Sequence, residues 1–144
     1  MIGFLASIAA GAVMSLQGVF NTKLSEKTGL LESNVFVQGT AFVFALIAML
    51  FWGKGNLGAV KNVNFLYLSG GLLGVIITVT VMLGISKLST TTAISVILIS
   101  QLLCAAIIDA FGLFGTEKVS FNIKNYIGIL LMISGILVFK FANR

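Results

Sequence analysis

Charged residues divide this sequence into long uncharged stretches. A hydrocarbon core of about 30 Å requires roughly 20 apolar residues in an α-helix. A backbone surrounded by lipid must also satisfy its own hydrogen bonds, so each uncharged stretch of this length predicts a membrane-spanning helix. Four stretches qualify, namely residues 1–22, 33–53, 62–86 and 88–108.

A fifth uncharged stretch is shorter and covers residues 125–139, between Lys124 and Lys140. The long side chains of these two lysines can extend to the membrane surface, so about residues 121–142 can form one more span. We therefore predict an all-α integral membrane protein, and we expect residues 1–144 to form a single transmembrane domain. Its five transmembrane helices are expected at about 2–22, 34–52, 65–86, 92–114 and 121–142.

Composition excludes several classes of protein. The chain is 58% hydrophobic and 9% charged, whereas a soluble domain carries about 25% charged residues. It has no His and one Cys, which excludes a zinc site, a disulfide framework and a Cys–His catalytic pair within one chain. We expect no cofactor, no metal and no enzymatic activity. The basic residues are scattered singly, which argues against a nucleic-acid partner.

The basic residues are shared almost evenly between the two sides of the predicted bundle. Side A, where the N-terminus lies, has four and side B has five. An excess of Lys and Arg on the cytoplasmic side normally sets orientation, so this balance predicts a chain that inserts both ways up. Two opposed copies would form a ten-helix antiparallel dimer with a two-fold axis in the membrane plane, as inverted repeats do. The alternative is a chain oriented by something that this count misses.

Polar side chains inside the predicted spans are the candidate substrate-binding residues. An amide in hydrocarbon needs hydrogen-bond partners, which a solute or a neighbouring helix could provide. An acid inside an apolar run is rare and usually functional. The alternative for the acid is a span that ends early and leaves it at the membrane surface. The candidates are Gln17, Asn21, Gln38, Gln101 and Asp109.

Counting spans places these residues at different depths. Gln17, Asn21 and Gln38 lie toward side B, Gln101 lies near the midplane, and Asp109 lies toward side A. In an antiparallel pair, Asp109 of one chain would be level with the amides of its partner. The sequence therefore predicts two polar sites, each built from both chains, with the two Gln101 residues between them.

Four glycines inside the predicted spans are candidates for helix–helix contacts. Helices in lipid associate by close backbone approach, which small residues permit. These glycines are Gly70, Gly74, Gly128 and Gly135.

Several short motifs together carry a resemblance to a known family. They are Gly11 to Gly18 (GAVMSLQG), Val37 to Thr40 (VQGT), Gly70 to Gly74 (GGLLG), and Gln101 to Leu103 leading to Asp109 to Gly115 (DAFGLFG). With these motifs the chain resembles small five-helix bacterial members of the drug/metabolite transporter superfamily, in the branch catalogued as domain of unknown function 606.

The resemblance implies a multi-pass protein of the bacterial cytoplasmic (inner) membrane with a transport role. It also implies an antiparallel pair, made from one dual-topology chain or from two oppositely oriented paralogues. The related small multidrug exporters use a Glu in their first helix, but no acid occurs in residues 1–22 here. That mechanism is therefore not expected, and Asp109 would have to take over the proton-coupling role.

We expect a secondary transporter of a small polar solute that acts as a dual-topology antiparallel homodimer. A passive dual-topology ion channel and a non-transporting membrane subunit of a larger complex are the alternatives. The expected partners are a second copy of the chain or a paralogue in the opposite orientation, membrane lipid and a small-molecule solute.

Overall fold

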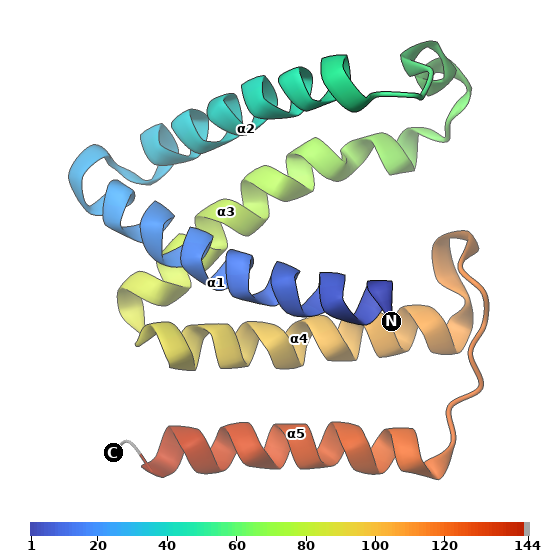
Figure 1. The fold of residues 1–144 in the computed structure, drawn as a ribbon. Coiled ribbons are helices and arrows are strands. Elements are labelled where there is room, and N and C mark those ends of the chain that lie inside the picture. Colours follow the sequence, from blue (N-terminus) through green and yellow to red (C-terminus); the bar gives the residue numbers. More distant parts are fainter. Residues whose placement is uncertain (143–144) are drawn as a thin grey trace. The chain divides into compact units, whose positions relative to one another are not determined.

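The computed structural model describes residues 1–142, and the regular structure in this range is helical (Figure 1). Four helical segments are long and apolar enough to cross a membrane: Ile2–Thr28, Leu30–Trp52, Phe65–Lys87 and Thr90–Phe111. A shorter apolar helix covers Ile123–Phe139. These findings confirm a small all-α membrane protein. The helices are α1 (Ile2–Thr28), α2 (Leu30–Trp52), α3 (Gly70–Lys87), α4 (Thr90–Phe111) and α5 (Ile123–Ala142), with short 3-10 helices η1 (Leu57–Asn62), η2 (Phe65–Ser69) and η3 (Leu113–Gly115).

The first predicted boundary is wrong, because α1 continues through the charged cluster that follows the apolar stretch. The Nζ atom of Lys23 lies 2.9 Å from Oε1 of Glu26, three residues later on the same exposed helix surface. Charge therefore ends the apolar stretch without ending the helix. Only Gly29 separates α1 from α2, and its φ of 100° is readily adopted only by glycine.

The other boundaries shift for local reasons. The predicted third span starts as the 3-10 helix η2, which is capped by the Asn64 side chain, and α3 begins at Gly70. The fourth helix ends at Phe111, because Gly112 adopts the left-handed conformation that commonly terminates helices. The fifth begins at Ile123, after Asn122, whose Oδ1 accepts a hydrogen bond from the Lys124 N–H.

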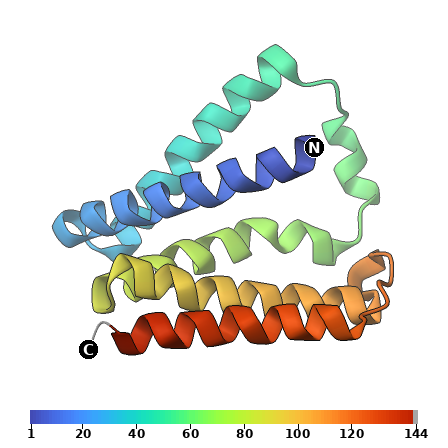
Figure 2. The ribbon, with the colours of Figure 1, turned by 60° about the horizontal axis from the view of Figure 1, so that its bottom comes forward.

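The chain divides into two compact units, of which the first is Met1–Lys87 and contains α1, α2 and α3. Its buried residues gather where the end of α1, the start of α2 and the end of α3 meet. Beyond this junction the three helices spread apart (Figures 1 and 2). Many of their large apolar side chains are exposed. The buried residues of this unit are Gly18, Thr22, Ser33, Asn34, Met82 and Ile85.

The second unit starts at Leu88 and contains α4 and α5. These two helices run side by side (Figures 1 and 2) and are joined by residues 112–122. The connection folds back onto α4, since the N–H of Val119 donates a hydrogen bond of 2.9 Å to the carbonyl of Asp109.

Candidate functional site

Two amides on one face of α2 reach across to α3. Nδ2 of Asn34 donates a hydrogen bond of 3.0 Å to the carbonyl of Val75. One turn later, Nε2 of Gln38 lies 3.5 Å from Oγ1 of Thr78, at the upper limit for a hydrogen bond. Thr78 itself donates to the Gly74 carbonyl at 2.9 Å. Asn34 is therefore firmly anchored to α3, whereas Gln38 is held loosely and could exchange Thr78 for another partner.

The other polar atom of Asn34 lacks a partner. The residue is only 3% exposed, and its Oδ1 is buried without a hydrogen bond among the residues that the structure describes. Rotating the amide would not remove this problem, because it would place Oδ1 against the Val75 carbonyl. A buried acceptor in this state costs about 1–3 kcal/mol. The α1–α2–α3 junction is thus less stable than an apolar junction of the same shape would be.

A groove of about 490 Å³ lies beside these amides. Its walls are apolar apart from Asn34 and Gln38. The surface of the groove is therefore almost entirely apolar, because Asn34 is buried and bonded to Val75 and Gln38 contacts Thr78. Its lining residues are Leu31, Asn34, Val35, Gln38 and Val75.

Small residues bring α1 against α3 at the same junction. A Cβ atom added to Gly18 would lie 2.9 Å from Cδ1 of Ile85 and 3.2 Å from Cγ1 of Val81. Thr22, one turn later, is 3% exposed, and its hydroxyl donates a hydrogen bond of 2.7 Å to the Gly18 carbonyl. Sequence reasoning did not assign this contact. The four-residue spacing of two small residues was the available signal.

The remaining predicted amides lie on two different helices. On α1, Gln17 is exposed and Asn21 is half-buried. Neither side chain forms a hydrogen bond within residues 1–142. On α4, Gln101 is exposed. Gln38 is thus the predicted site residue that the structure joins to another polar side chain, Thr78.

Asp109 lies in a second groove, of about 290 Å³, between α4 and α5. Its side chain is half-buried, and Asn125 of α5 lines the same groove. Asn125 falls within the predicted fifth span, but sequence reasoning did not single it out. Its signal was its spacing from Gly128, which places both residues on one helix face.

The four glycines predicted to pack helices differ in their surroundings. A Cβ atom on Gly74 would lie 3.4 Å from Nε2 of Gln38, an ordinary contact between α3 and α2. The same atom on Gly70, Gly128 or Gly135 would have no neighbour within 4 Å in the part of the chain that the structure describes. Gly128 nevertheless lines the Asp109 groove. Packing against a partner chain remains a prediction for these three residues.

One comparison with known proteins gives a match that covers nearly the whole chain. Residues 2–138 match the family model described as "Putative inner membrane exporter, YdcZ". The comparisons with curated proteins and with solved structures found no match.

Proposed function

The chain belongs to the YdcZ family of inner membrane exporters, and we propose that it is a secondary transporter of a small polar solute. The family is one of membrane transporters rather than enzymes, and the chain is a multi-pass protein of the inner membrane. Within this class, we propose carrier transport by two copies of the chain in opposite orientations.

The observation that carries the proposal is the pair of amides between α2 and α3. Asn34 and Gln38 line one groove between α2 and α3, two helices of strongly apolar composition. Gln38 is held by a 3.5 Å contact, and the buried Oδ1 of Asn34 has no hydrogen-bond partner within residues 1–142. Local polar groups of this kind suit a solute site that opens and closes. An open ion pore would instead need a continuous track of polar groups. Because the polar groups described above are local, they favour the carrier over the channel.

The antiparallel dimer is supported by charge and by exposure. The basic residues divide four to five between the two sides of the predicted bundle. This small difference gives little bias toward either orientation in the membrane. Large apolar side chains such as Phe42, Phe44 and Leu50 are more than two-thirds exposed. Lipid or a second copy must cover them. We propose that Gln17, Asn21 and Gln38 of one protomer and Asp109 of its partner form each of two shared sites, with both Gln101 residues between them.

Transport is tested with the purified chain in vesicles of phosphatidylethanolamine and phosphatidylglycerol. Radiolabelled alanine, glucose and phenethylammonium serve as zwitterionic, uncharged and cationic probes. A carrier gives saturable uptake of at least one probe, and an excess of the same unlabelled compound inside the vesicles accelerates that uptake. Flux that rises linearly with concentration would support the channel instead. The absence of flux for every probe would favour the subunit of a larger complex.

A further inference from the structure

The groove between α4 and α5 is formed by two matching helix faces. Its lining residues on each helix follow the spacing i, i+3, i+4, i+7, which places them on one face. The volume of about 290 Å³ is near the lower end for small-molecule sites. The lining residues are Leu102, Ala105, Ala106 and Asp109 on α4, Asn125, Gly128, Ile129 and Met132 on α5, and Phe121 before α5.

This groove is polar at one end and apolar at the other. Since α4 and α5 are adjacent and connected by a short segment (Figures 1 and 2), the end of α4 lies beside the start of α5. Asp109 and Asn125 therefore share the end near the connection, and Leu102 and Met132 share the opposite end. Between them, the small side chains of Ala105 and Ala106 and the bare Cα of Gly128 leave the middle of the groove open.

The charge of Asp109 is not neutralised within residues 1–142. No ion pair or side-chain hydrogen bond of Asp109 occurs in this part of the chain, although the residue is half-buried in a mainly apolar groove. A carboxylate without an ion pair in a mainly apolar groove can form a charge-assisted hydrogen bond with an organic ammonium ion. The Asn125 amide beside it can also accept hydrogen bonds from an ammonium group.

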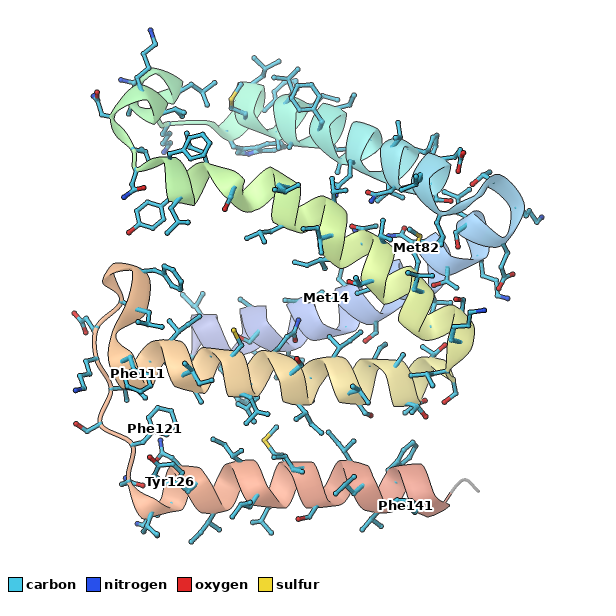
Figure 3. The ribbon with its side chains drawn as sticks, turned by 180° about the vertical axis from the view of Figure 1, so that it is seen from behind. Met14, Met82, Phe111, Phe121, Tyr126 and Phe141 are labelled. Atoms are coloured by element: carbon cyan, nitrogen blue, oxygen red, sulfur yellow. The ribbon has the colours of Figure 1, made fainter. Side chains whose placement is uncertain are left out.

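An aromatic ring completes the polar end. Phe121 lines the groove, and its ring lies 6.0 Å, centroid to centroid, from that of Tyr126 (Figure 3). The face of an aromatic ring attracts a cation that lies within about 6 Å. Carboxylate, amide and ring therefore favour the same charge at the same end.

We propose that this groove binds an amphipathic organic monocation. The ammonium group lies at Asp109 and Asn125, and the apolar tail follows Ala105 and Gly128 toward Met132. This inference deepens the proposed function, because it names the substrate class that the transporter takes. Binding is measured below without any flux, so either proposal can fail while the other stands.

The first experiment uses the unmodified sequence. Asp109 is the sole Asp of the chain, so protein labelled with ¹³Cγ-aspartate gives one carboxyl resonance. In phosphatidylglycerol nanodiscs, phenethylammonium should move this resonance to saturation, whereas the neutral analogue 2-phenylethanol should leave it in place. A resonance that phenethylammonium does not move overturns the proposal. The proposal is also overturned if the resonance moves when phosphatidylethanolamine replaces phosphatidylglycerol but does not move on addition of phenethylammonium. A lipid headgroup, rather than a soluble cation, would then occupy the groove.

Matched variants test the two ends of the groove separately. Asp109→Asn should weaken phenethylammonium binding about tenfold or more, whereas Glu117→Gln, which removes the same charge from the exposed connection, should not. Ala105→Leu should fill the middle of the groove and weaken binding by a similar factor. Cys104→Leu adds bulk to the neighbouring exposed position outside the groove and should not. Unchanged affinity in Asp109→Asn overturns the proposal.

Discussion

Gly18 of α1 and Ile85 of α3 are in such close contact that a Cβ atom on Gly18 would lie 2.9 Å from Cδ1 of Ile85. Both residues are buried, and Met82, one turn before Ile85, is 0% exposed. The close contact between α1 and α3 therefore depends on glycine, which has no side chain, at position 18.

Gly18→Leu should lower the free energy of unfolding by about 1–3 kcal/mol, because the added side chain would overlap Ile85 and the stiff Val81. Gly18→Ala should cost less, since the end of the Ile85 side chain can rotate away. The measurement is unfolding of the detergent-solubilised protein by increasing SDS. Gly11→Ala on the same helix has open space around its Cβ, and it should be neutral or stabilise by up to about 1 kcal/mol. Equal effects of the substitutions to Ala at both positions would argue against the contact.

Asn34→Leu should leave the free energy of unfolding unchanged or raise it by about 1 kcal/mol. The substitution removes a buried acceptor that has no partner among the described residues, and the Val75 carbonyl stays within helix α3. Asn34→Asp keeps the shape but replaces the donor with an oxygen that faces the Val75 carbonyl, and it should destabilise by about 1–3 kcal/mol. SDS unfolding again provides the measurement. A destabilised Asn34→Leu protein would mean that the amide is fully satisfied.

Substitutions at two glycines of α3 should have separable effects. Gly74→Leu should disrupt packing against α2, because its Cβ already faces Gln38 at 3.4 Å. A Cβ atom on Gly70 has no neighbour within 4 Å among residues 1–142, so Gly70→Leu should impair only association with a second copy. Unfolding and chemical cross-linking of the dimer distinguish the two. Normal dimer yield from Gly70→Leu would place this position against lipid.

Much of this fold could be predicted from the sequence, because the length and apolarity of a span reflect the thickness of the membrane. The helix ends could not be predicted in this way. Lys23 and Glu26 leave the apolar stretch yet continue α1, and Gly112 stops α4 by its backbone conformation rather than by polarity.

The candidate sites were harder to predict than the spans. Asp109 and Gln38 were evident as polar groups in apolar stretches. Their neighbours Asn125 and Val75 depend on how two helices cross, which periodicity within one helix does not determine. The hydrogen bond from Asn34 to Val75 joins residues 41 positions apart, and a backbone carbonyl carries no sequence signal.

Reporter proteins fused to the C-terminus should be active on both sides of the membrane if the chain inserts both ways up. Gly55→Lys with Leu57→Lys should then fix their loop in the cytoplasm, because both positions are exposed and Gly55 has space for a side chain. Substituting Gln at the same positions should leave the mixture unchanged. Activity on one side only in the unmodified chain would contradict dual topology.

Mixed dimers should reveal whether each site is shared. Two chains with orientations fixed in opposite senses are co-expressed with different tags and purified as a pair. Asp109→Asn and Gln17→Ala on different chains should damage the same shared site and leave about half of the uptake rate. Both substitutions on one chain should damage both sites and abolish uptake. The reverse pattern would place Asp109 and Gln17 of the same chain in one site.

The convergence of α1, α2 and α3 at a single end gives the first unit the mechanics of a lever. At 1.5 Å per residue, Ile2 lies about 24 Å along α1 from Gly18. A rotation of α1 by about 10° around that contact would move its free end by about 4 Å while Gly18 and Ile85 stay together. Small changes in angle at the packed junction are therefore amplified at the far end, where the exposed side chains offer little resistance from within the unit.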